Sequence, residues 1–84
     1  MEHDEVFRRV SSVLAREFEL DRSSIVPEAD IFTDLELDSL DAIDLIAGLE
    51  AEFGVRINRQ ADGESIRAIR TLTDVCAFIT CKLT

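Results

Sequence analysis

The feature that most constrains the fold is the stretch of residues 39–54, SLDAIDLIAGLEAEFG, which has the pattern of a single amphipathic helix. Its apolar residues recur at the three- and four-residue spacing of a helix with one face on a core. The expected core-facing residues are Ala42, Leu45, Ile46, Leu49 and Phe53. Asp41, Asp44 and Glu52 are expected to point away from that side, and Gly54 is suited to a left-handed C-cap.

Three further helices are expected around this one. Residues 5–18 carry an apolar stripe with Asp4 as a candidate N-cap, and residues 64–69 fit one short helix. The last helix is expected to start near Thr71 or Thr73, because Thr71 and Asp74 have the spacing of a capping box. No alternating strand pattern is present. The sequence therefore predicts one all-α domain, residues 1–84, a small four-helix bundle with three longer helices and one short helix.

The segment before residue 39 is a long connection with the only proline of the chain, Pro27. Its apolar pairs, residues 25–26 and 31–32, are too short to form strands and are expected to pin the segment to the core. Long connections are uncommon in small domains and are often functional.

Charge is distributed very unevenly. The net charge is −9, and no Lys or Arg lies between Arg22 and Arg56. This acidity disfavours nucleic acid and anionic membranes as partners, because both repel a negative surface. The sequence shows neither a basic-then-apolar signal region nor an apolar run of membrane-spanning length, so a cytoplasmic protein without membrane insertion is expected.

Metal chemistry finds little support in the sequence. Cys76 and Cys81 are five residues apart, ~140° around a helix, so they cannot bridge each other there and are expected to be reduced structural thiols. The only histidine is His3, which leaves a zinc site short of ligands. A calcium loop beginning at Asp34 would need Gly at its sixth position and Glu at its twelfth, where the chain has Ser39 and Leu45.

Ser39 is the most informative polar residue. Serine is common as an N-cap, but Asp38 caps equally well. If Asp38 is the cap, the Ser39 hydroxyl is left at the positive end of the helix dipole, a position that suits a phosphodiester. A nucleophilic serine would need a nearby base, and His3 lies in a terminus that is expected to fray. The chain is therefore expected not to be an enzyme.

Residues 27–57, PEADIFTDLELDSLDAIDLIAGLEAEFGVRI, resemble the core of an acyl carrier protein. The resemblance implies that Ser39 receives a 4′-phosphopantetheine arm from coenzyme A, and that acyl cargo is carried as a thioester on the arm's thiol. It implies that Asp38 caps the helix and contacts the transferase. Leu45, Ile46, Leu49 and Ile57 are candidates to line a cavity for the acyl chain.

The same resemblance implies a partner-facing surface on this helix. Its apolar and acidic members would be Leu40, Ile43, Ala47, Asp41, Asp44, Glu50 and Glu52. The implied partners are a phosphopantetheinyl transferase and an acyl-carrier synthetase, ketosynthase or acyltransferase with a basic patch, in fatty-acid, lipid or polyketide-type biosynthesis. The carrier is expected to be a monomer.

Two features depart from the family's pattern. Glu36 stands where the family usually has Gly, which would allow a positive backbone φ. Residues 57–71 are longer and richer in Arg than in the bulk fatty-acid carriers, and together the two features favour a specialised member. Two alternatives stay open: a peptidyl or aminoacyl carrier, and an acidic helical adaptor without a prosthetic group.

Overall fold

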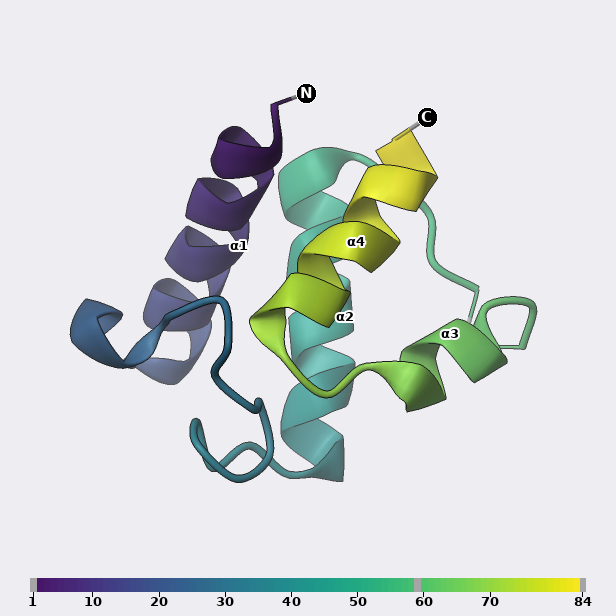
Figure 1. The fold of residues 1–84 in the computed structure, drawn as a ribbon. Helices are drawn as coiled ribbons and strands as arrows, with labels where there is room; N and C mark the ends of the chain where they lie inside the picture. The colour runs from purple at the N-terminus through teal and green to yellow at the C-terminus, as the bar shows by residue number, and fades with distance from the viewer. Residues whose placement is uncertain (1, 59, 84) are drawn as a thin grey trace.

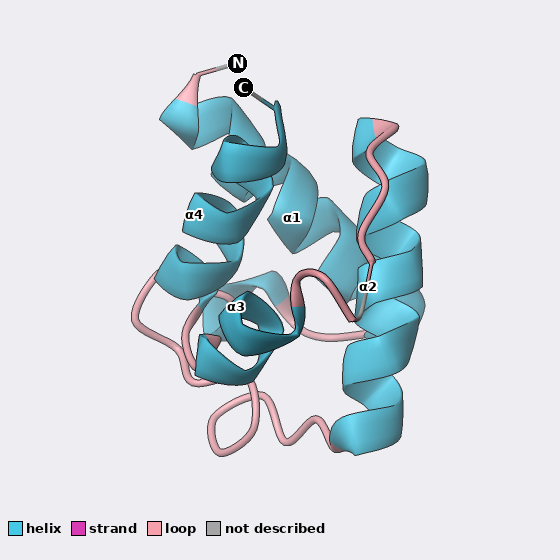
Figure 2. Ribbon diagram, turned by 90° about the vertical axis from the view of Figure 1, so that its right-hand side faces the viewer, coloured by secondary structure: helices cyan, strands magenta, loops and turns pink. Residues whose placement is uncertain are grey.

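The computed structural model describes residues 2–58 and 60–83, and within these ranges the chain is mainly helical. Its elements are α1 (His3–Phe18), the 3₁₀ turn η1 (Arg22–Ser24), α2 (Ser39–Phe53), α3 (Gly63–Ala68) and α4 (Leu72–Leu83). α1 packs against both α2 and α4, whereas α3 packs against α4. α1 and α2 run in opposite directions, with α3 set beside the lower part of α4 (Figures 1 and 2). The predicted all-α bundle of three longer helices and one short helix is confirmed.

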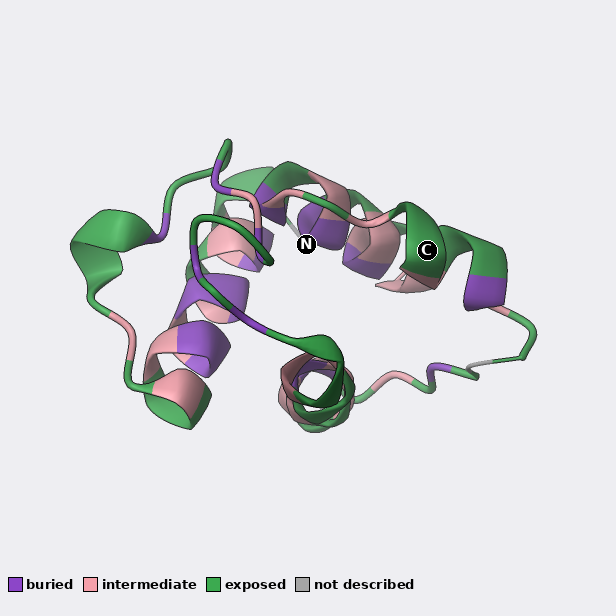
Figure 3. Cartoon of the chain, turned by 90° about the horizontal axis from the view of Figure 1, so that it is seen from below, coloured by how far each residue is buried: buried purple, intermediate pink, exposed green. Residues whose placement is uncertain are grey.

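The core lies between α1, α2 and α4. The most deeply buried side chains come from α1 and α4 and are Val6, Val10, Val13, Leu14, Leu72, Val75, Cys76 and Ile79. Viewed from the end where α2 begins, the buried segments of α1 turn toward the middle of the bundle (Figure 3). α1 begins at His3, and its N-cap is Glu2, which makes no side-chain capping hydrogen bond. The prediction of Asp4 as the N-cap is therefore wrong. Asp4 lies instead in the first turn, where the helix dipole favours an acid.

Gly48 sets how closely α1 and α2 approach each other. A Cβ added at this position would lie 3.0 Å from Val13 Cγ1. Glycine in a helix interior costs about 1 kcal/mol relative to alanine. The close packing of the two helices explains why the sequence keeps a residue that is locally unfavourable.

The long connection between α1 and α2 is fastened to the start of α4. The Ile31 N–H donates to Arg70 O at 2.8 Å, and the Leu72 N–H donates to Ala29 O at 3.2 Å. Ile25 and Ile31 are buried as expected, but their neighbours Val26 and Phe32 are exposed. One residue of each apolar pair therefore anchors the connection, and the other faces outward.

The expected capping box at the start of α4 is present. The Thr71 N–H donates to Asp74 Oδ2 at 3.1 Å, and the Asp74 N–H donates to Thr71 Oγ1 at 3.3 Å. Hydrogen bonds from the Thr71 and Arg70 N–H groups lower the pKa of Asp74. Because the pKa of Asp74 is lower in the folded state, the ionised carboxylate stabilises the fold. This contribution to the free energy of unfolding is fully present above the ordinary pKa of the carboxyl and is lost as the pH falls through the folded pKa.

Cys76 is buried in the core, and burial raises the pKa of its thiol to about 11. The thiol therefore stays protonated and unreactive at neutral pH. Cys81 is exposed on α4. None of the described helices combines the length and apolar character needed to cross a membrane.

Candidate functional site

Ser39 is the first residue of α2, and Asp38 is the N-cap that precedes it. The Asp41 N–H donates to Asp38 Oδ1 at 2.8 Å, and the Asp38 N–H donates to Asp41 Oδ2 at 3.1 Å. These two bonds form a reciprocal capping box. Because Asp38 performs the capping, Ser39 is not the N-cap, and its exposed side chain lies at the positive end of the helix dipole.

Glu36 adopts a left-handed backbone conformation, with φ of 58°. Glu36 therefore has the positive φ that a glycine at this position would adopt without strain. Leu35 and Leu37, on either side, are both buried, and the Leu37 N–H donates to Ile31 O at 3.0 Å. These contacts hold Glu36 in its conformation two residues before the cap of α2.

Replacing Glu36 with glycine is expected to raise the free energy of unfolding by about 0.5–1 kcal/mol. Left-handed geometry costs an ordinary residue roughly 1–2 kcal/mol, and the greater freedom of glycine in the unfolded chain offsets only part of that gain. Denaturant titration would measure the change. Glu36→Ala is the control, because it removes the same charge but keeps the Cβ. An equal gain from both variants would contradict the strain account.

The outward face of α2 continues from Ser39 as an apolar surface with an acidic flank. Leu40 is 72% exposed and Ile43 is 41% exposed. Ala47 and Asp44 are also exposed. Large apolar side chains this open to solvent on an otherwise amphipathic helix are typical of a site where another molecule packs. We call Leu40, Ile43, Asp44 and Ala47 the outer face of α2.

Three predicted partner-facing acids make contacts within the chain. Asp41 is part of the capping box, and Glu50 Oε2 accepts a hydrogen bond from the Ile57 N–H at 3.0 Å. Glu52 lies 3.8 Å from Arg9 Nε and 3.9 Å from Arg16 Nη2, both on α1. The expectation that Glu52 points away from the core side is therefore wrong. It follows Leu45 by seven residues, nearly two helical turns, so both residues lie on the same side of α2.

An apolar cavity of about 470 Å³ opens beside Ser39. All four residues that the sequence suggested for a cavity line it: Leu45, Ile46, Leu49 and Ile57. The sequence did not indicate that other segments would complete the walls, which also include Ile31, Phe32, Ser39, Ala42, Ile43, Ile66, Arg67, Ile69, Arg70, Val75 and Phe78. Its volume is within the range of small-molecule sites.

The basic segment after α2 contributes to this cavity. Arg67 and Arg70 are the charged residues among those that line it. Arg70 Nε also lies 3.7 Å from Asp30 Oδ2, so this arginine ties the α3–α4 junction to the long connection. Arg56 is exposed, and Arg59 lies outside the described residues. Hydrogen bonds from the Thr33 and Phe32 N–H groups, followed by the charge of Arg70, lower the pKa of Asp30.

The described part of the chain contains no cluster of three or more His, Cys, Asp or Glu side chains that could hold a metal ion. The site combines an exposed serine, an apolar cavity beside it and an exposed face on the same helix. Such a combination offers an attachment point and a shelter for an apolar ligand.

Comparisons with known proteins agree with this chemistry. Residues 8–79 match the family model described as "Phosphopantetheine attachment site". The chain is 37% identical over 83 residues to an acyl carrier protein of Thermosynechococcus vestitus, covering 99% of this chain and 98% of that protein. It is 35% identical over 80 residues to an acyl carrier protein of Thermotoga maritima, covering 95% and 94%. It is 36% identical over 79 residues to "Acyl carrier protein 2" of Ralstonia nicotianae, covering 94% and 93%.

Proposed function

This chain belongs to the acyl carrier protein family, whose prosthetic group is phosphopantetheine, and from that premise we propose that Ser39 is its attachment site. The observation that carries the proposal is the position of Ser39, exposed at the first residue of α2 and on the wall of the apolar cavity. Attachment would form a phosphodiester at Ser39 Oγ with loss of the hydroxyl proton, while the diphosphate bond of coenzyme A breaks and adenosine 3′,5′-bisphosphate leaves. The helix dipole stabilises the negative charge of that phosphodiester.

The cavity gives the carrier a place to shelter cargo. An acyl chain on an arm that starts at Ser39 can reach the cavity, because Ser39 itself is part of the wall. Leu45, Leu49 and Ile57 are buried residues that would contact it. Burial there removes about 25 cal/mol of unfavourable hydration per Å² of apolar surface. The role of these residues is to hold the chain and exclude water, while the arm supplies the thiol that bears the thioester.

The outer face of α2 is proposed as the docking surface. Family members work with a phosphopantetheinyl transferase and with synthase or transferase enzymes. Leu40 and Ile43 offer apolar contact, and Asp38, Asp41 and Asp44 add negative charge to the first turns of α2. A basic patch on a synthetase, ketosynthase or acyltransferase would be steered to this face and would dock reversibly. Glu52 is left out of this surface because its carboxylate pairs with α1.

The partners implied by such a surface belong to fatty-acid, lipid or polyketide-type biosynthesis. The acidic face favours this over a peptidyl or aminoacyl carrier. Two other features favour a dedicated carrier over a bulk one. Glu36 stands at the positive-φ position before α2, and Arg67 and Arg70 line the cavity beside Ser39.

Loading the chain with octanoyl-coenzyme A and a broad-specificity phosphopantetheinyl transferase tests the carrier function. The expected product has the added mass of one octanoyl-phosphopantetheine. Neutral hydroxylamine should then remove only the octanoyl group, because it cleaves a thioester and leaves the phosphodiester intact. Added mass that resists hydroxylamine would contradict thioester carriage. The absence of any product from a chain shown to be in the apo form would favour the helical adaptor.

A further inference from the structure

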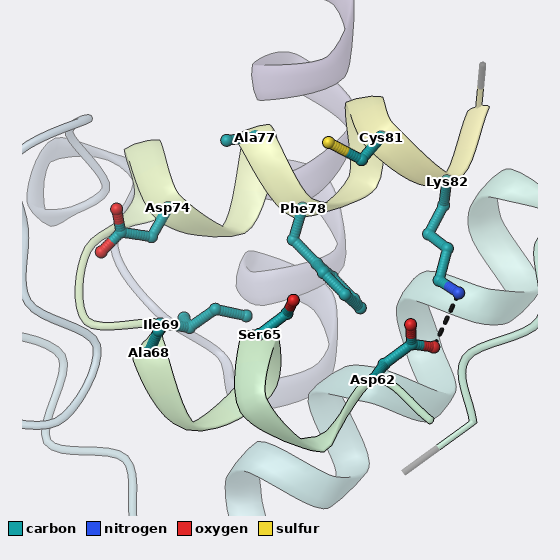
Figure 4. Close-up of a pocket in the computed structure, with 9 residues that line it drawn as sticks. All are labelled: Asp62, Ser65, Ala68, Ile69, Asp74, Ala77, Phe78, Cys81 and Lys82. Carbon is teal, nitrogen blue, oxygen red and sulfur yellow. Dashed lines mark ion pairs between the residues drawn. The ribbon is translucent and has the colours of Figure 1, made fainter. Parts of the chain in front are cut away.

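A second cavity, of about 460 Å³, lies between α3 and α4. Its lining residues are shown in Figure 4 and are Asp62, Ser65, Ala68, Ile69, Asp74, Ala77, Phe78, Cys81 and Lys82. Two of them, Ile69 and Phe78, also line the apolar cavity beside Ser39. These two side chains are therefore the wall that the cavities share.

Phe78 is the larger part of this wall. Its ring extends from α4 toward α3, where Ser65 and Asp62 lie (Figure 4). Lys82 Nζ lies 5.9 Å from the centroid of the ring and 2.6 Å from Asp62 Oδ2. The hydrogen bond from Lys82 lowers the pKa of the Asp62 carboxyl. The Asp62–Lys82 pair joins the start of α3 to the end of α4 beside the ring.

We infer that Phe78 is a gate between the two cavities and sets the length of acyl chain that the carrier can shelter. This inference rests on the proposed function, since the chain is taken to be carried from Ser39. Ser39, Leu49 and Phe78 all line the first cavity, so a chain that enters beside Ser39 can reach the ring of Phe78. With the ring in place, the chain ends in the first cavity. With the ring displaced or replaced by a smaller side chain, the terminal carbons continue into the second.

The walls of the second cavity suit the end of such a chain. Ala68 and Ala77, which are exposed, and the half-buried Ile69 supply apolar surface, so this cavity is open to solvent. Asp62 and Lys82 neutralise each other at 2.6 Å. An aromatic side chain adopts one of a few rotamers, so a change of rotamer can block a passage or open it. Phe78 is only half-buried, which leaves room for a smaller residue at this position without loss of the main core.

Methyl NMR of the acylated protein distinguishes the two cavities. Ile46 and Leu49 line only the first cavity, and Ala68 and Ala77 line only the second. In the wild type, octanoyl and hexadecanoyl arms should both shift the Ile46 and Leu49 methyl signals and leave those of Ala68 and Ala77 in place. In Phe78→Leu and Phe78→Ala, the hexadecanoyl arm should also shift Ala68 and Ala77. Each signal is compared with the same variant carrying an unacylated arm, so packing changes cancel.

Phe53→Leu is the matched control, because Phe53 is half-buried on α2 and lines neither cavity. It should behave as the wild type. A parallel titration of the apo proteins with free decanol needs no arm, and it should reach Ala68 and Ala77 only in the two Phe78 variants. A failure of Ser39 to accept the arm would therefore count against the proposed function and leave the gate testable. Shifts of Ala68 and Ala77 that are equal in the wild type and in both Phe78 variants, or absent from all of them, would overturn the gate.

Discussion

Replacing Leu14 with alanine is expected to lower the free energy of unfolding by about 3 kcal/mol, within the ~2–5 kcal/mol range of buried Leu→Ala changes. Leu14 is 0% exposed and lies on α1, the helix that packs against both α2 and α4. The cavity left behind would lie on the helix that packs against both of the other long helices. Because domains have total stabilities of roughly 5–15 kcal/mol, such a loss would bring this small domain close to unfolding.

Denaturant titration followed by circular dichroism would measure the loss. Leu40→Ala is the matched control, since it makes the same chemical change at a side chain that is 72% exposed. Its effect on stability should stay within about 0.5 kcal/mol, as is usual for surface changes. Equal losses from the two variants would contradict the assignment of Leu14 to the core and of Leu40 to the outer face of α2.

Two substitutions of Asp38 are expected to separate its roles. Asp38→Ala should lower the free energy of unfolding by ~1–2 kcal/mol, because the Asp41 N–H loses its acceptor at the start of α2. Asp38→Asn should keep the stability, since asparagine caps a helix as well as aspartate does. If the charge of Asp38 also contacts the transferase, Asp38→Asn should slow arm transfer by roughly fivefold, the value of an exposed ion pair of ~1 kcal/mol.

Denaturant titration and the initial rate of arm transfer would measure the two effects. A loss of stability in Asp38→Asn as large as in Asp38→Ala would contradict the capping role. An unchanged transfer rate in Asp38→Asn would confine Asp38 to that capping role.

Local features of this fold could be predicted from the sequence, because neighbouring residues determine them. The span of α2, its cap at Asp38 and the capping box at Thr71 and Asp74 each depend on residues within one or two turns of each other. The apolar stripe of α1 could be predicted in the same way, because it depends only on the spacing of residues within one helix. The prediction of Asp4 as the N-cap of α1 was wrong, because Glu2, Asp4 and Glu5 lie close together and the sequence pattern does not distinguish which of them precedes the helix.

Features that depend on distant contacts could not be predicted. The reason for Gly48 lies in Val13 on another helix, and the partners of Glu52 lie on α1. The cavity beside Ser39 is completed by the long connection, α3 and α4. The spacing of apolar residues along the sequence does not determine how these segments are placed relative to α2. Glu36 shows the converse case. Its residue type argued against a positive φ, but the burial of Leu35 and Leu37 overrides that local preference.

The central claim is that Ser39 carries the phosphopantetheine arm, and the most direct test is the intact mass of the protein. Apo wild type and Ser39→Ala would each be incubated with coenzyme A and a broad-specificity phosphopantetheinyl transferase. The wild type should gain the mass of one phosphopantetheine and Ser39→Ala should gain nothing. Its stability should stay within about 0.5 kcal/mol of the wild type, because Ser39 is exposed and does not cap α2. A gain in Ser39→Ala, or none in the wild type, would contradict the claim.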